Sequence, residues 1–207
     1  MSFELIGKKL RMTSLPQDDG STTPVTLIEL YPLIVLQVKT PDTDGYWALQ
    51  VGYDRVPGHR LNKPELGHQK GIEGLPCKRL IEFRLDGPAE YQVGETLPWD
   101  IVGEGTTVNV IGRTKGRGFT GVMKRHGFHG AKATHGTSQV HRKPQSGGAT
   151  DAARVFKGVK KPGRYGNTRS TVLNMKVVEL DEEHGLLVLK GSVPGANGKI
   201  IRIVPHE

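Results

Sequence analysis

Short runs of apolar residues, separated by residues that favour turns, dominate both ends of the chain. The runs are rich in Val, Ile, Leu, Thr and aromatic residues, as is typical of β-strands, and groups of Asp, Gly and Pro lie between them. Few stretches show an apolar period of 3.6 residues over a useful length, so long helices are not expected. The predicted strands cover residues 25–31, 33–39, 46–53, 79–85, 107–111, 171–181, 186–191 and 199–204.

Many short strands favour a small β-barrel, since closure removes unpaired strand edges. Asn197-Gly198, between the last two predicted strands, indicates a tight hairpin turn because both residue types readily adopt positive φ. Strands occur on both sides of residues 112–170, so this middle segment should leave and re-enter one barrel. The expected fold class is therefore mainly β, a small closed β-barrel with a long, basic, mostly irregular loop extension. Residues 1–111 and 171–207 would form the discontinuous barrel domain.

Residues 112–170 differ from the rest of the chain in apolar content and in charge. They contain no Leu or Ile but 12 Gly. Such a segment buries too little apolar surface to offset a backbone ordering cost of about 1–2 kcal/mol per residue. It also carries 14 Lys and Arg and one acidic residue, whereas the remainder of the 207-residue chain carries 15 basic and 20 acidic residues. The chain, with a net charge of +8, is thus a mildly acidic body with one strongly basic insert.

The middle segment is expected to become ordered on a polyanionic partner, because aromatic residues recur among its cations. Lys and Arg suit phosphates, aromatic rings and guanidinium planes suit bases, and Gly permits close backbone approach. A purely solubilising loop would contain more Glu, Ser and Pro and fewer aromatic residues. The candidate RNA-binding residues are Lys115, Arg117, Phe119, Lys124, Arg125, Phe128, His135, Arg142, Phe156, Lys157, Lys160, Lys161, Arg164 and Arg169.

Other chemistries fit the sequence less well. Residues 116–121 match G-x-G-x-x-G, but the acidic residue expected about 20 positions later in a dinucleotide-binding fold is missing. The four His between residues 126 and 141 have no nearby Cys and only Asp151 as a carboxylate, so a metal site is not predicted. Cys77 is expected to be an inert, buried thiol, and a lone cysteine suits a reducing, cytoplasmic compartment.

No catalytic residue, cofactor, small-molecule substrate or membrane association is therefore predicted. The sequence has no apolar run near the roughly 20 residues that a membrane-spanning helix requires. Two alternatives remain open at this point. One is a nucleotide-dependent enzyme that uses the glycine-rich loop at 116–121, and the other is a free-standing nucleic-acid chaperone or DNA-compacting protein.

The sequence also resembles the family of the universal large-subunit ribosomal protein number three, in its bacterial-type length, from about Ile6 to Ile203. The strongest match is the stretch 112–142, which contains the glycine-rich loop and the basic residues after it. Residues 155–158 and the run 186–195, similar to the closing hairpin of the family, also match.

This resemblance implies a β-barrel on the surface of the large ribosomal subunit and a loop that enters large-subunit ribosomal RNA. It further implies a non-catalytic role in early subunit assembly, in the cytoplasm, beside the large-subunit proteins numbered fourteen and nineteen. The loop tip would approach the peptidyl transferase region. By its place in the resemblance, the tip contains Gln145, Ser146, Gly147 and Gly148, where this sequence departs from the pattern of many bacterial members.

Overall fold

A computed structural model of the chain describes residues 3–17, 20–72, 74–99 and 101–206. The chain divides into unit 1, Met1–Gly112 with Ser170–Glu207, and unit 2, Arg113–Arg169.

The expected mainly β class is confirmed. The strands are β1 (Leu5–Pro16), β2 (Thr22–Leu30), β3 (Leu33–Lys39), β4 (Ala48–Arg55), β5 (Cys77–Arg84), β6 (Thr96–Leu97), β7 (Thr107–Arg113), β8 (Phe119–Thr120), β9 (Gly163–Arg164), β10 (Arg169–Asp181), β11 (Leu186–Lys190) and β12 (Ile200–Pro205). The short helices are α1 (Pro41–Asp44), the 3-10 helix η1 (Gly58–Arg60), α2 (Lys63–His68) and α3 (Val122–His126).

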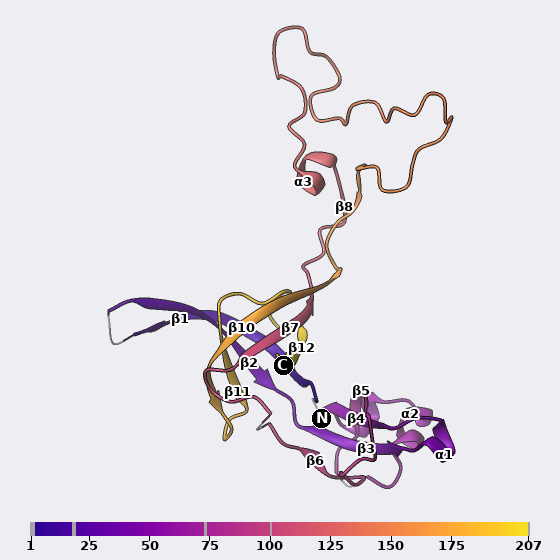
Figure 1. Ribbon diagram of the computed structural model, residues 1–207, viewed down its shortest axis with the longest axis vertical. Coiled ribbons are helices and arrows are strands. Elements are labelled where there is room, and N and C mark those ends of the chain that lie inside the picture. The colour runs from indigo at the N-terminus through magenta and orange to yellow at the C-terminus, as the bar shows by residue number, and fades with distance from the viewer. Residues whose placement is uncertain (1–2, 18–19, 73, 100, 207) are drawn as a thin grey trace. The chain divides into compact units, whose positions relative to one another are not determined.

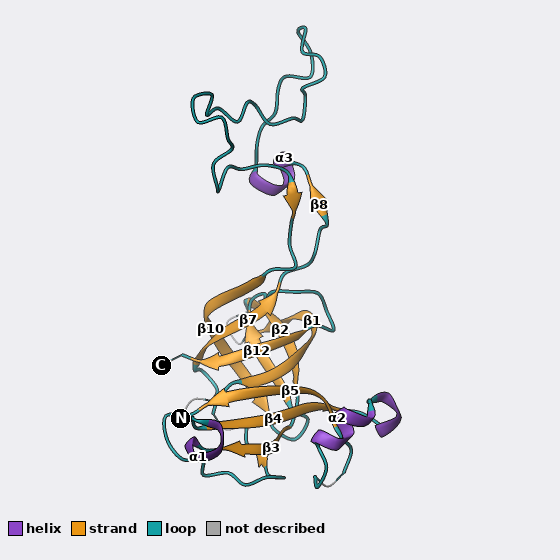
Figure 2. Ribbon diagram, turned by 90° about the vertical axis from the view of Figure 1, so that its right-hand side faces the viewer, coloured by secondary structure: helices purple, strands orange, loops and turns teal. Residues whose placement is uncertain are grey.

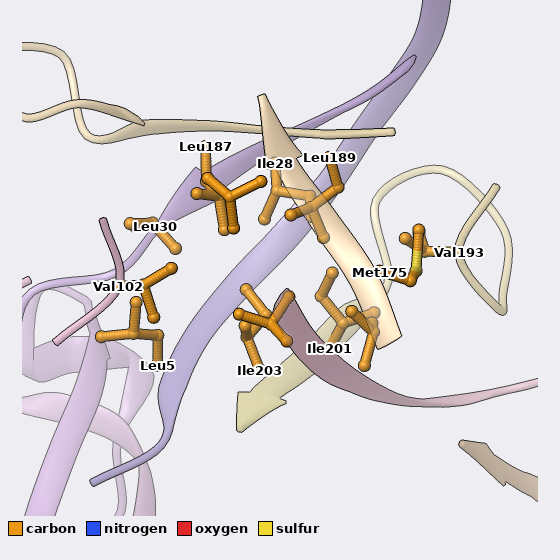
Figure 3. Packing of buried hydrophobic residues seen from close by; sticks show 13 residues of the cluster. Leu5, Ile28, Leu30, Val102, Met175, Leu187, Leu189, Val193, Ile201 and Ile203 are labelled. Atoms are coloured by element: carbon orange, nitrogen blue, oxygen red, sulfur yellow. The ribbon is translucent and has the colours of Figure 1, made fainter. Parts of the chain in front are cut away.

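Six strands of unit 1 pair in the order β1-β12-β7-β10-β11-β2 (Figure 1). Strand β2 also pairs with β1, so the order closes on itself as a barrel. Aliphatic side chains from different strands meet inside it, among them Ile28, Leu187 and Ile203, all fully buried (Figure 3). Burial of these apolar surfaces is the main stabilising contribution to this part of the fold.

The remaining strands of unit 1 form a separate sheet in the order β5-β4-β3-β6 (Figure 2). The expectation that all flanking strands belong to one barrel is therefore wrong. The reason is a second core, in which Val35 of β3, Val51 of β4 and Phe83 of β5 pack together away from the barrel interior. Apolar strands predict burial, but they do not specify which of two cores receives them.

Strands β1 and β12 serve both cores, because side chains alternate between the two faces of a strand. Leu5 and Ile201 lie in the barrel core, whereas their neighbours Ile6 and Ile200 pack against the core of the four-stranded sheet. The Tyr31 N–H donates to the Ile6 carbonyl at 2.8 Å, where the chain passes from one sheet to the other. The two sheets of unit 1 are therefore joined through shared strands.

The predicted hairpin at Asn197-Gly198 is also wrong, because β11 and β12 are not neighbours. Gly198 does adopt a positive φ of 79°. A turn is present here, because the Lys199 N–H donates to the Ala196 carbonyl at 3.2 Å. However, the Gly198 N–H donates to the Lys9 carbonyl of β1 at 2.7 Å, so the turn leads into pairing with β1 and does not join β11 to β12 as a hairpin. The buried Lys9 ammonium donates to the carbonyls of Val193 at 2.9 Å and Gly195 at 3.2 Å, which satisfies backbone groups of the long connection.

We predict that global stability resides in the unit 1 cores. Ile203→Ala removes a fully buried side chain from the barrel and should lower the free energy of unfolding by about 2–5 kcal/mol. Val155→Ala, at a position 61% exposed in unit 2, should change it by no more than about 0.5 kcal/mol. Urea unfolding, followed by the fluorescence of Trp47 and Trp99, measures both values. Equal losses in the two variants would contradict this assignment.

Candidate nucleic-acid interface

Unit 2 begins as two antiparallel arms joined by backbone hydrogen bonds. The Thr114 N–H donates to the Thr168 carbonyl at 3.0 Å, and Arg117 and Tyr165 are linked by an N–H to carbonyl bond of 2.9 Å. Farther along, Phe119 and Thr120 of β8 pair with Arg164 and Gly163 of β9. The arms approach closely because Gly166 has no Cβ; a Cβ there would collide with the Lys115 carbonyl. The glycine content thus allows two basic strands to run side by side.

Unit 2 has almost no core of its own. Between residues 113 and 169, all of them described, Thr120 and Val122 are the only residues classed as buried. Helix α3 has five residues and ends at Gly127, whose φ is 73°. A helix this short is marginal in isolation. Hydrogen bonds, and not burial of apolar side chains, therefore fix the path of the chain in unit 2.

The cations of unit 2 are open to solvent. Twelve of the 14 Lys and Arg are exposed, and Arg125 and Lys161 are half-buried. Every ion pair found among the described residues lies in unit 1. Asp151, itself exposed, is the single acidic residue of unit 2. The unit therefore presents a net formal charge of +13 with no carboxylate partner among the described residues.

Of the candidate RNA-binding residues, the structure leaves eight cations exposed and gives Arg125 an internal role. The Arg125 guanidinium donates to the Lys161 carbonyl at 2.8 Å, and the His126 ring nitrogen lies 3.2 Å from the same oxygen. Arg125 thus ties α3 to the returning arm, which the sequence did not predict. The exposed cations are Lys115, Arg117, Lys124, Arg142, Lys157, Lys160, Arg164 and Arg169, and His135 is exposed as well.

The aromatic residues of unit 2 lie largely outside any core. Phe119 is 79% exposed and Phe156 is 50% exposed, whereas Phe128 is half-buried beside His126. Exposed rings of this size are unfavourable in water unless another surface covers them. They are therefore available to stack on bases.

Two arginines already lie over aromatic rings. The Arg154 guanidinium is 5.3 Å from the Phe156 ring centroid, and that of Arg117 is 5.7 Å from the Tyr165 centroid. Arg154 and Tyr165 were not among the candidates from the sequence, although the spacing Arg-x-Phe at 154–156 is a signal that identifies the first pair. Both pairs present a planar cation backed by a ring, a surface suited to single-stranded or looped RNA.

Three of the four residues assigned to the loop tip, Gln145, Ser146 and Gly147, line cavities with other parts of unit 2. Gln145 and Ser146 line a cavity of about 880 Å³ together with Phe128 and Lys160. Gly147 lines a neighbouring cavity of about 370 Å³, and the Gly148 N–H donates to Ser146 Oγ at 3.2 Å. Distance along the chain from both arms therefore does not mean isolation in space, since this segment returns to the residues that follow α3.

The glycine-rich motif does not form a dinucleotide-binding unit. Residues 116–121 include the two-residue strand β8 and precede the five-residue helix α3, whereas such a site needs a full strand-turn-helix unit.

Within the described residues, no group of three or more His, Cys, Asp and Glu could hold a metal ion. Cys77 is buried, as predicted, and burial raises the pKa of its thiol. Among the described helices, none is long and apolar enough to span a membrane.

Comparison with known proteins links this chain to one family. A family model described as "Ribosomal protein L3" matches residues 90–186. The chain is 47% identical over 199 residues to the large ribosomal subunit protein uL3 of Leifsonia xyli, covering 95% of this chain and 91% of that protein. It is also 47% identical over 199 residues to the protein of the same name from Pelotomaculum thermopropionicum, with coverages of 96% and 94%. The large ribosomal subunit protein uL3 of Gloeothece citriformis is 44% identical over 209 residues, which cover 100% of this chain and 98% of that protein.

Proposed function

This chain belongs to the ribosomal protein L3 family, and we propose that it is a structural constituent of a bacterial-type large ribosomal subunit. In this role unit 2 binds large-subunit ribosomal RNA, and unit 1 anchors it at the subunit surface. The chain performs no catalysis itself. It acts by occupying space between RNA helices that would otherwise repel one another.

The unpaired positive charge of unit 2 is the observation that carries this proposal. A segment with 14 cations, one acidic residue and two buried side chains obtains little stabilising free energy by folding on itself. Phosphates supply the missing counter-charge, and release of condensed cations from RNA makes the association favourable. Glycines and paired arms keep the segment thin where RNA helices pack closely.

The aromatic and guanidinium groups add a second type of contact. Phe119 and the Arg154–Phe156 and Arg117–Tyr165 pairs offer planes to unstacked bases. We assign the exposed lysines to phosphates, because an ammonium contacts phosphate as a point charge and carries no base code. Lysines thereby supply affinity, and aromatic or arginine planes fix the position of the segment on the RNA.

The family resemblance supports finer roles. We propose that the chain joins the large subunit early in assembly and lies beside the large-subunit proteins numbered fourteen and nineteen. Residues Gln145 to Gly148 would approach the peptidyl transferase region. Their side chains carry no charge, so this segment is suited to positioning and contributes little to electrostatic affinity.

The first test is the salt dependence of RNA binding. If about half of the 14 cations neutralise phosphates, a plot of log affinity against log salt should have a slope of about −5 to −6. Replacing residues 115–167 with a short Gly-Ser turn removes 12 of these cations. The new ends are compatible, because Thr114 and Thr168 are already joined by a 3.0 Å hydrogen bond. Most of the slope should then disappear, while circular dichroism retains the β signal of unit 1. An unchanged slope would assign RNA binding to unit 1.

The second test separates the arms from the tip. Lys124, Lys157 and Lys160 are exposed, and their joint replacement by Ala should reduce the salt slope by about 2–3 and impair incorporation into large subunits. A matched control replaces the exposed unit 1 lysines Lys63, Lys176 and Lys190, and it should leave incorporation unchanged.

In the same experiment, a Gln145→Ala/Ser146→Ala variant should enter gradient-purified large subunits normally but alter the peptidyl transferase rate or the response to drugs that bind there. The proposal fails if this tip variant is the one missing from the particles while the triple lysine variant assembles normally. Recovery of the chain outside ribosomal particles, bound equally to DNA and RNA, would favour a free-standing nucleic-acid chaperone instead.

A further inference from the structure

Strand β5 presents the long unpaired strand edge of unit 1, within the residues that the structure describes. The barrel strands follow one another in a closed order, whereas the four-stranded sheet ends on the eight-residue β5 at one side and on the two-residue β6 at the other (Figure 2). An edge strand exposes a row of N–H and C=O groups that can pair with another chain. The length of β5 is sufficient for an added strand.

At the start of this edge, a side-chain amide forms the hydrogen bonds that a neighbouring strand would form. The buried Gln69 carboxamide accepts a hydrogen bond from the Cys77 N–H at 2.7 Å and donates one to the Cys77 carbonyl at 2.8 Å. The Cys77 backbone groups therefore point away from β4. Farther along the strand this alternation shifts, because the Leu85 N–H donates to the Trp47 carbonyl at 3.1 Å in the register that pairs Ile81 with Val51. The groups of Arg79 and Ile81 therefore face β4, and those of Leu80 and Glu82 face outward. Among the described residues, no backbone hydrogen bond is found to the outward groups of Leu80 and Glu82.

An apolar groove lies beside the same edge. It has a volume of about 320 Å³ and runs between α2 and β5, with Leu61 and Pro64 on one side and Leu80 on the other. Leu80 is 40% exposed, and Leu66 of α2 is 37% exposed. Because successive side chains of a strand point to opposite faces, an added strand would direct every second side chain to the face that carries this groove.

The charges around the edge select the kind of strand that fits. Lys78 and Arg79 are exposed on β5. The nearby carboxylates are engaged. Glu82 accepts hydrogen bonds from the Lys39 ammonium at 2.6 Å and the Tyr46 hydroxyl at 2.8 Å. Asp54 lies 3.7 Å from Arg79 Nε, and Glu65 accepts from the Asn62 N–H at 2.8 Å, which leaves Lys78 as the exposed cation without a carboxylate partner among the described residues. Two copies of this edge would repel each other, which disfavours self-pairing. An acidic strand meets attraction instead, and a phosphate backbone offers neither N–H donors for the edge carbonyls nor a side chain for the groove.

We propose that the β5 edge is a docking site for an extended, acidic segment of another protein. The segment adds a fifth strand to the four-stranded sheet, pairs with the outward backbone groups of Leu80 and Glu82, and places an apolar side chain in the groove beside Leu80. Main-chain pairing supplies affinity in this type of recognition, and the groove and cations supply specificity.

The test uses the full chain and an acetylated peptide of alternating Glu and Val residues, nine residues long. Because unit 2 attracts any polyanion, the readout is local: amide hydrogen exchange across residues 78–84. The peptide should slow exchange at Leu80 and Glu82 by about tenfold or more, since paired edge amides exchange only on opening. A Lys78→Glu/Arg79→Glu variant should need about tenfold more peptide for the same protection. A Lys176→Glu/Lys190→Glu control should respond as the unmodified chain does.

Two further probes make the result decisive. The same peptide with N-methylated backbone amides keeps its charge but loses its donors, so it should give no protection at β5. The proposal is overturned if the Glu-Val peptide leaves these amides unprotected, or if the methylated peptide protects them equally. It is also overturned if a uridine oligonucleotide of the same charge protects them and the peptide does not, because the edge would then be a nucleic-acid surface.

Discussion

Mutual repulsion among the cations of unit 2 is the constraint on which the organisation of this chain depends. Exposed charges act on one another over a screening length of about 8 Å at physiological ionic strength. The 14 cations of unit 2 lie within residues 113–169, which contain one Asp as their single acidic residue. Without a partner the segment must therefore remain open, since collapse would bring like charges together without an apolar gain. In the function proposed for this chain, phosphate is the counter-charge that offsets this repulsion.

Unit 1 supplies the stability that unit 2 lacks. Strands β1 and β12 place alternate side chains in two cores, so the barrel and the four-stranded sheet support each other. Arms that begin at β7 and β10 thus emerge from paired strands of a well-packed unit. Such an arrangement suits the proposed function, in which a segment without a core enters RNA while its ends remain fixed. The four-stranded sheet, less involved in this task, keeps a free edge for a protein neighbour.

Local sequence patterns predicted the elements better than their assembly. The run 33–39 was predicted as a strand and matches β3 residue for residue. Strand β1 was missed, because Lys8, Lys9 and Arg11 interrupt its apolar pattern. The structure explains their presence: the Lys9 ammonium is buried against two carbonyls, and Lys8 pairs with Glu29 at 3.2 Å. Partners this distant in sequence leave no local signal.

The candidate interface shows the same limit. Charge and composition identified the basic and aromatic residues of unit 2, because exposure of Lys and Phe there follows from the lack of aliphatic residues. The bond from Arg125 to the Lys161 carbonyl and the cavity that gathers Gln145 with Phe128 depend on the path of the chain. Sequence separation suggested a remote tip, whereas a chain that folds back brings the tip residues near the helix α3.

Hydrogen exchange across residues 127–162 tests the central claim most directly, by comparing the free chain with the chain in gradient-purified large subunits. If unit 2 needs phosphate to become ordered, these amides should exchange close to the unprotected rate in the free chain, while the buried barrel strands remain protected. In the subunit their exchange should slow by about 100-fold or more. Strong protection of these amides in the free chain, or none in the subunit, would contradict the account.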